Sequence, residues 1–120
     1  MESPSPDAAR GLLITSRREG TVTVFRLVGE LDLASAPDLI AALAALTDGA
    51  ATPVVLDMAG VGFVDSTGVR VLLEAQAASP QRVVALMAPS RAVTRVLDLT
   101  RLRGRFVELD PDSDLSDLVA

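Results

Sequence analysis

The sequence of 120 residues predicts a single α/β domain built on a mixed sheet. Short apolar runs alternate with segments whose apolar residues recur every three or four positions, which is the pattern of strands followed by helices. The first two runs are separated by Arg18-Glu19-Gly20, and Gly20 suits the positive φ of a tight hairpin turn. An opening hairpin is antiparallel, so the sheet is expected to be mixed and not purely parallel. The sequence contains no internal repeat.

The predicted strands are short and mostly buried. They are expected at residues 12–15, 21–28, 54–57, 83–87 and 105–109, with the last at an edge of the sheet. Phe25 and Leu27 share one face of the second strand. Val22 and Val24 share the other face, so both faces of this strand are expected to be partly covered. The run that ends at Asp57 is continuously apolar, which is typical of a strand buried on both sides.

The first predicted helix follows the second strand. Ser35 is a favoured cap, Pro37 suits the first turn, and Asp48-Gly49 ends the pattern. Its buried stripe is expected to consist of Leu39, Ile40, Leu43 and Leu46. Asp32 lies between the strand and this helix, where forming a turn is the commoner role of an aspartate.

Two further helices and a terminal one complete the pattern. A connection with Gly60 and Gly62 leads into a helix that ends near residues 78–80. The next helix opens at Pro89-Ser90, and a short acidic helix is expected between residues 110 and 120. The buried residues of the two longer helices are expected to be Val69, Leu72, Leu73, Val93, Val96 and Leu97. Residues 1–10 are rich in Ser, Pro and Asp, so we expect a disordered leader and a domain over residues 11–120.

The composition argues against most enzyme classes. The chain has no Cys and no His, which removes thiol catalysis, Ser–His triads and most transition-metal sites. All eleven basic residues are arginines, so no lysine can serve a P-loop or a Schiff base. A net charge of −5 and the lack of Tyr and Trp oppose nucleic-acid binding. We therefore expect a protein without enzymatic activity, cofactor or metal, and the absence of a membrane span or signal sequence predicts a cytoplasmic location.

The most informative stretch is Asp65-Ser66-Thr67-Gly68, where the central strand passes into a helix. Side-chain oxygens at such a position commonly cap the helix, because they accept hydrogen bonds from the first-turn N–H groups. The same N–H groups and the helix dipole favour anions. A phosphate on Ser66 would therefore be compatible with the fold, and it would add roughly −1.5 to −2 units of charge beside Asp65. The pattern is consistent with a simple cap or with a phosphorylation switch that repels a partner.

A second cluster, near the C-terminus, is basic. It consists of Arg91, Arg95, Arg101, Arg103 and Arg105, with Asp98 as the acidic residue among them. We interpret these arginines as solvated charges of a helix face and loop that pair with the acidic tail. The alternative is a patch for an acidic partner or a nucleotide.

Three segments together resemble the STAS-domain family, and within it the bacterial anti-sigma factor antagonists. They are residues 27–32, 55–57 and 63–69, and the resemblance extends from about residue 12 to 118. It implies one small domain with a mixed, mainly parallel sheet of four or five strands and helices packed largely on one side. In this family the unphosphorylated antagonist binds an anti-sigma factor, a serine kinase of the histidine-kinase-like (GHKL) ATPase fold, and frees a sigma factor. Phosphorylation by that kinase dissolves the complex, and a metal-dependent phosphatase restores binding.

The resemblance also implies roles for individual residues. Ser66 would be the phosphoacceptor, with Thr67 as a less favoured second site. The partner surface would consist of Asp32, Asp65, Ser66, Thr67, Gly68, Val69 and Arg70. Within it, Asp32 would lie beside Ser66 and Asp65 would position the turn. Gly68 would let the partner approach the helix closely.

Three further expectations concern alternatives and departures. STAS domains also act without phosphorylation in transporters, lipid-trafficking systems and stress-sensing scaffolds, and Ser66 would then be only a cap. A Mg²⁺-dependent phosphoesterase built on Asp32, Asp65 and Ser66 lacks an activated nucleophile. Arg101 stands where many relatives have a glycine after the third helix, so the turn there is expected to differ.

Overall fold

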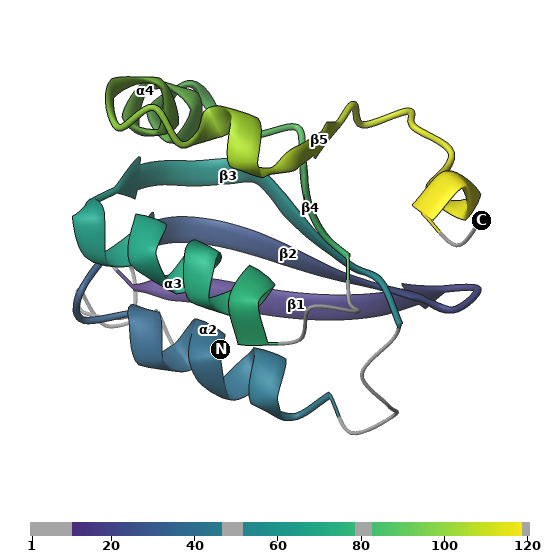
Figure 1. Ribbon diagram of the computed structural model, residues 1–120. Coiled ribbons are helices and arrows are strands. Elements are labelled where there is room, and N and C mark those ends of the chain that lie inside the picture. The colour runs from purple at the N-terminus through teal and green to yellow at the C-terminus, as the bar shows by residue number, and fades with distance from the viewer. Residues whose placement is uncertain (1–10, 47–51, 79–82, 119–120) are drawn as a thin grey trace.

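The computed structural model describes residues 11–46, 52–78 and 83–118. These residues form one five-stranded sheet whose strand order follows the sequence, β1-β2-β3-β4-β5 (Figure 1). The strands are β1 (Leu12–Glu19), β2 (Val22–Leu31), β3 (Val54–Val64), β4 (Val84–Met87) and β5 (Val107–Leu109). β1 is antiparallel to β2, and every later pair is parallel. The predicted mixed, mainly parallel sheet is confirmed, whereas the expected leader over residues 1–10 lies outside the described residues.

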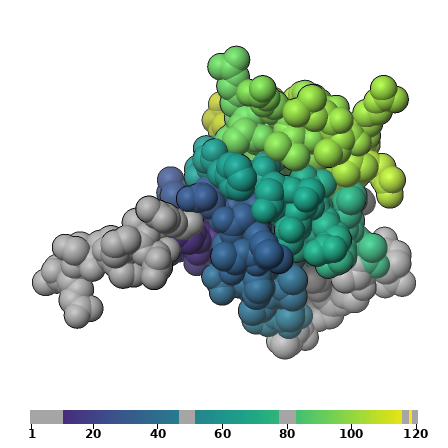
Figure 2. All heavy atoms as spheres, turned by 90° about the vertical axis from the view of Figure 1, so that its left-hand side faces the viewer, coloured from purple at the N-terminus to yellow at the C-terminus, as the bar shows by residue number. Residues whose placement is uncertain are grey.

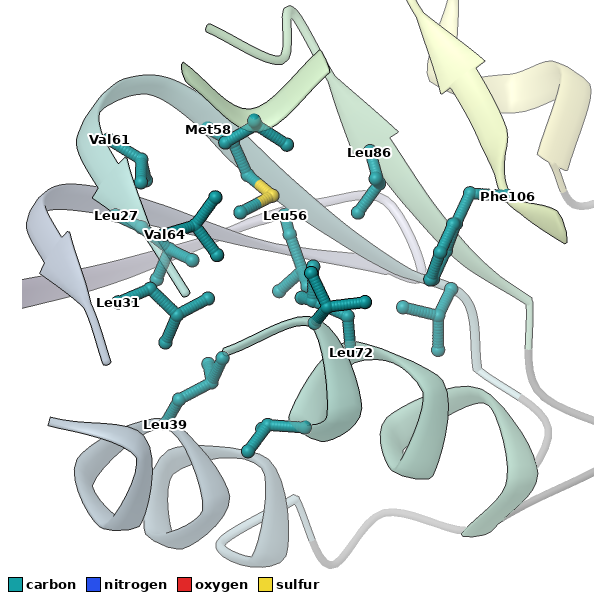
Figure 3. Packing of buried hydrophobic residues seen from close by; sticks show 14 of the residues in the cluster. Leu27, Leu31, Leu39, Leu56, Met58, Val61, Val64, Leu72, Leu86 and Phe106 are labelled. Carbon is teal, nitrogen blue, oxygen red and sulfur yellow. The ribbon is translucent and has the colours of Figure 1, made fainter. Parts of the chain in front are cut away.

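Within the described residues, three α-helices pack against one face of this sheet. They are α2 (Ala36–Ala44), α3 (Ser66–Ala78) and α4 (Arg91–Leu99). Each contributes to one hydrophobic cluster together with the inward side chains of β2 and β3, as Figure 3 shows for Leu39 and Leu72 opposite Leu56. This confirms the expectation that the helices lie largely on one side. No helix of the described residues is long and apolar enough to cross a bilayer.

The opposite face of the sheet is covered at one end only. Val22, Val24 and Val55 form a second cluster there with Leu115, which belongs to the short 3₁₀ helix η2 (Leu115–Leu118). Phe25 belongs to the first cluster, so the predicted covering of both faces of β2 is confirmed. The expected acidic terminal helix is present as a 3₁₀ turn.

The hairpin is longer than predicted. Glu19 pairs with Val22, so the turn is Gly20-Thr21, and Gly20 has the positive φ of +62° that the turn needs. β1 continues past Thr15 although its later residues are polar. It is an edge strand with an exposed face, so its backbone hydrogen bonds to β2 do not require alternating apolar side chains.

β3 is also longer than predicted, because Gly60 and Gly62 do not interrupt it. β3 runs to Val64. A Cβ on Gly60 would lie 2.9 Å from Cγ2 of Val28, so glycine allows β2 to approach closely there. The β2–β3 register shifts twice along this stretch, which means that the strand bulges instead of ending.

Two features of α2 correct the sequence prediction. Ile40 is 47 % exposed, because the buried side of the helix is centred on Leu39 and Ile40 is turned away from it. The helix ends at Ala44, and the predicted stop at Asp48-Gly49 lies outside the described residues. The hydroxyl of Ser35 makes no capping bond, since it donates to the carbonyl of Glu30 and accepts from the N–H of Asp32.

The beginning of α4 matches the prediction. The hydroxyl of Ser90 accepts from the N–H of Val93 at 3.3 Å and donates to the carbonyl of Val61, which ties the helix to β3. Val93 and Leu97 are buried, and Val96 packs against the same cluster, as predicted.

The C-terminal end of α4 contradicts the expectation of a different turn. Arg101 itself adopts the left-handed conformation, with φ of 61°. Its N–H donates to the carbonyl of Asp98, and the N–H of Leu102 donates to that of Leu97, which is the Schellman arrangement that glycine usually completes. A 3₁₀ turn, η1 (Arg103–Arg105), follows, so the last strand starts two residues later than predicted.

Candidate functional site

The candidate site lies at the edge of the sheet where β2 and β3 end. Leu31 pairs with Val64, so the next residues, Asp32 and Asp65, emerge side by side at this edge. The N–H of Asp65 donates to the carbonyl of Leu31 at 3.3 Å and joins the two chain segments directly. Figure 2 views the molecule from this side, with the start of α3 between α2 below and α4 above.

Asp65 is the residue that caps α3. Its Oδ1 accepts from the N–H of Gly68 at 2.9 Å, and its carbonyl accepts from the N–H of Val69 at 3.1 Å. Ser66 is therefore the first residue of the helix and not its cap. The interpretation of Ser66 as a cap is wrong, because the carboxylate one position earlier already satisfies the first turn.

Ser66 is exposed at the start of α3. Among the described residues its hydroxyl makes no hydrogen bond, so the side chain is presented to solvent at the positive end of the helix dipole. Thr67 is half-buried and Arg70 is exposed one turn further along. Arg70 Nε lies 3.9 Å from Glu74 Oε1, a solvent-exposed pair that contributes little to stability.

Gly68 and Val69 face the interior and not the surface. A Cβ on Gly68 would lie 2.6 Å from the carbonyl oxygen of Leu31 and 2.7 Å from Cγ2 of Val64. Val69 is buried in the main cluster. Their side-chain positions are filled by this chain's own packing, and glycine at position 68 lets α3 approach the end of β2. That both residues border a partner surface stays a prediction.

Asp32 forms a turn of its own. One carboxylate oxygen, Oδ1, accepts from the N–H groups of Ala34 at 3.1 Å and Ser35 at 3.0 Å. Its predicted turn role is therefore present, and the β2–β3 register also brings it to the edge that carries Asp65.

Two exposed apolar side chains at this edge were not predicted from the sequence. Leu33, just after Asp32, is 70 % exposed, and Phe63, just before Val64, is 48 % exposed. Strand alternation could have located Phe63, because Val64 faces the core and its neighbour must face away. The edge that carries Ser66 therefore also has two exposed apolar side chains.

The chemical groups at this edge are two carboxylates and an exposed hydroxyl. Asp32 and Asp65 supply carboxylates beside the hydroxyl of Ser66. The chain contains no His or Lys that could act as a base for this hydroxyl. Among the described residues, no group of three or more acidic side chains gathers in a way that could hold a metal ion.

The arginine cluster also differs from its predicted arrangement. Arg103 pairs with Asp98 and Glu108 and not with the acidic tail. Hydrogen bonding to the Glu108 carboxylate raises the pKa of Arg103. Within the described chain, the other four arginines have no acidic partner: Arg91, Arg95, Arg101 and Arg105.

The family model described as "Mlab, STAS domain" matches residues 14–109. The chain belongs to the STAS domain family. The match runs from the third residue of β1 to the end of β5 and includes the edge that carries Ser66. No sequence among curated proteins matches the chain.

Solved structures of other STAS proteins share this fold. An anti-sigma factor antagonist from Mycobacterium paratuberculosis is 24 % identical, with a TM-score of 0.70 over 96 % of this chain and 94 % of that one. The Bacillus cell fate determinant SpoIIAA in its phosphorylated form is 24 % identical, with a TM-score of 0.62 over 89 % and 96 %. The murine anion transporter Slc26a9 is 19 % identical, with a TM-score of 0.60 over 69 % of this chain and 14 % of the transporter. The STAS domain described here is thus structurally like anti-sigma factor antagonists.

Proposed function

We propose that this STAS domain is a phosphorylatable anti-sigma factor antagonist. In its unmodified state it binds an anti-sigma factor that is also a serine kinase of the GHKL ATPase fold, and thereby frees a sigma factor in the bacterial cytoplasm. The observation that carries the proposal is the exposed Ser66 hydroxyl at the first position of α3, with its capping role taken over by Asp65. Modification of Ser66 therefore removes no bond that holds the described fold.

The transfer step needs a base that this chain lacks. The Ser66 oxygen attacks the γ-phosphorus of ATP, its proton passes to a base of the kinase, and ADP leaves with the electrons of the broken P–O bond. A metal-dependent phosphatase reverses the modification by hydrolysing the serine phosphate ester. The chain itself is a substrate of both enzymes and not an enzyme.

The charge of the phosphate supplies the release mechanism. It adds roughly −1.5 to −2 units at a turn that already carries Asp32 and Asp65. The helix N-terminus favours that anion, so the modified protein stays folded while the surface becomes repulsive to a partner selected for the neutral turn. Exposed Leu33 and Phe63 remain in place, so the switch acts through charge and not through loss of apolar area.

The relatives support this proposal at the level of the family. The M. paratuberculosis protein is named an anti-sigma factor antagonist, and SpoIIAA has been solved in a phosphorylated form. A second candidate follows from the likeness to Slc26a9, an anion transporter. In that case the chain is an interaction module of a transporter, a lipid-trafficking system or a stress-sensing scaffold, and Ser66 remains unmodified.

The test combines phosphosite mapping with partner binding. The chain is incubated with ATP and the anti-sigma kinase of its own host, and peptides are mapped by mass spectrometry. We expect one phosphate, on Ser66, and no incorporation in Ser66→Ala. Unchanged incorporation in Ser66→Ala would show that the acceptor lies elsewhere, with Thr67 the first residue to inspect.

Binding to the same kinase, measured by calorimetry, tests the switch. Ser66→Asp is expected to weaken binding while Ser66→Ala retains it, and both should unfold within about 0.5 kcal/mol of the wild type because Ser66 is exposed and caps nothing. Ser16→Asp, at an exposed serine of β1, is the matched control for an added charge. Equal affinities for all four proteins would favour the transporter-type module instead.

A further inference from the structure

The exposed side of α3 continues well beyond Ser66. Ser66, Arg70, Glu74 and Ala77 follow one another at intervals of three or four residues, and all are exposed. They form one solvent-facing stripe along the helix. A protein that contacts Ser66 and lies along α3 would therefore also contact the other end of this stripe, at Ala77.

A pocket of about 350 Å³ opens beside that stripe, between α3 and η1. It is lined by Arg70, Leu73, Glu74, Gln76, Ala77 and Arg105. The side-chain amide of Gln76 donates to the carbonyl of Arg105 at 2.8 Å, which fixes η1 against the helix. Phe106 follows η1 directly, is buried and lies near Leu72 in the core (Figure 3). The packing of Phe106 therefore holds η1, which forms one wall of the pocket, against the core.

The pocket combines an apolar surface with positive charge. Leu73 and Ala77 offer apolar area, while Arg70 and Arg105 come from the two elements that form its walls. Glu74 is the acidic residue among the lining side chains, so the arginines outnumber it. Such a site fits an apolar side chain flanked by carboxylates.

The chain segment that contains η1 has the same sign of charge. Residues 91–109 contain five arginines and two carboxylates, a net charge of +3, which leaves −8 for the rest of a chain whose net charge is −5. Arg103 holds both carboxylates, with Nε 2.7 Å from Glu108 and Nη1 3.1 Å from Asp98. Of the four remaining arginines, which have no acidic partner in the part of the chain that the structure describes, Arg105 lines the pocket and keeps its charge for a partner.

We propose that the α3–η1 pocket, with Arg70 and Arg105 in its walls, is a second docking surface, which takes an acidic segment of a partner protein with an apolar side chain among its carboxylates. This extends the proposed function, because the α3 stripe joins the pocket to Ser66 and Arg70 belongs to both surfaces, so the test uses Ala77 and Arg105, which line the pocket alone. A nucleic acid or an anionic membrane fits less well. An extended polyanion would meet Glu74 at the pocket and would leave the apolar area of Leu73 and Ala77 without an apolar side chain to contact.

The probe for the test is a synthetic heptapeptide of three glutamates, one leucine and three glutamates. It is titrated into the full chain in low salt and followed by amide NMR shifts. We expect shifts concentrated on Leu73, Gln76, Ala77 and Arg105, with affinity that falls as salt rises. Shifts spread evenly over the surface, or confined to other elements, overturn the proposal. So does equal or stronger binding, at the same residues, of a single-stranded oligonucleotide or of vesicles containing phosphatidylserine.

Charge reversal separates this site from general electrostatics. Arg105→Glu is expected to weaken peptide binding about tenfold, and Ala77→Glu similarly, because each places a carboxylate in the pocket. Arg26→Glu makes the same change of charge at an exposed arginine of β2, outside the pocket, and should alter the affinity less than twofold. Equal losses in Arg105→Glu and Arg26→Glu would refute a defined site.

Ser66→Asp distinguishes the two proposals. Position 66 lies outside the pocket lining, so the substitution should leave peptide binding unchanged even though it is expected to weaken kinase binding. If the chain is never phosphorylated but still binds the peptide at this pocket, the proposed function is refuted and the second docking surface is supported. The thermal midpoint of each variant confirms that a loss of binding is not a loss of fold.

Discussion

Gly68→Ala gives the sharpest test of how the Ser66 turn is built. The substitution adds a single methyl group at the third position of α3. That methyl carbon would lie 2.6 Å from the carbonyl oxygen of Leu31, 2.7 Å from Cγ2 of Val64 and 2.9 Å from Cγ of Leu31. None of these atoms belongs to a flexible surface side chain, so the start of the helix must move away from the end of β2.

The magnitude follows from two opposed effects. Restoring ordinary contact distances requires a displacement of roughly 0.5–1 Å against packed neighbours. Such overpacking costs about 1–3 kcal/mol, and three simultaneous contacts place the cost near the upper end. Alanine is more favourable than glycine in a helix by about 0.5–1 kcal/mol. We therefore expect Gly68→Ala to lower the free energy of unfolding by about 2 kcal/mol.

Urea denaturation of the full chain measures this value. The matched control is Gly62→Ala, because a Cβ at Gly62 meets nothing within 4 Å and Gly62 does not have a positive φ. The control should be neutral or stabilising by up to about 1 kcal/mol, since it reduces the freedom of the unfolded chain. If Gly68→Ala were as stable as Gly62→Ala, the close packing of α3 on β2 would not be what requires glycine here. The shift should also displace Ser66, so slower phosphorylation of Gly68→Ala is a second readout.

Two further predictions concern the ends of helices. Asp65→Ala should lower the free energy of unfolding by about 1 kcal/mol, because the N–H of Gly68 loses its capping bond. Asp65→Asn should largely keep that bond and the stability of the wild type. Equal stabilities of the two variants in urea denaturation would contradict the assignment of Asp65 as the cap of α3. Arg101→Gly should raise the thermal midpoint, with a gain of about 0.5–1 kcal/mol, because glycine adopts the left-handed φ of 61° without strain. Arg95→Gly, inside α4, is its control and should destabilise by about 1 kcal/mol; a loss of stability in Arg101→Gly would count against the strain argument.

The elements that the sequence predicted best are those in which a local signal and burial agree. Ser90 caps α4 as expected, and Val93 and Leu97 are buried, because helical spacing and a capping hydroxyl point to the same start. The two faces of β2 were also predicted, since alternation placed Phe25 on one side and Val24 on the other.

The errors occur where a neighbouring element decides the outcome. Gly60 indicates a break when the strand is considered alone, yet β2 approaches so closely there that glycine is what lets β3 continue. Asp65 and Ser66 are both good capping residues, and local propensity cannot choose between them. The tertiary structure places Asp65 at the capping position, because the N–H of Asp65 donates a hydrogen bond to the carbonyl of Leu31 at the end of β2.

The amino-acid pattern by itself determined the alternation of strands and helices, the mixed sheet and the position of a serine at the start of a helix, because periodicity and capping are properties of neighbours along the chain. Only the tertiary structure decided which of these residues reach solvent. The approach of α3 to the end of β2 buries Gly68 and Val69, while it leaves Ser66 and Arg70 outside. The folding of η1 onto α3 likewise brought Arg105 into the same pocket as Arg70, although the two residues are far apart in the sequence. Exposure and juxtaposition arise from packing between elements, which no local pattern contains.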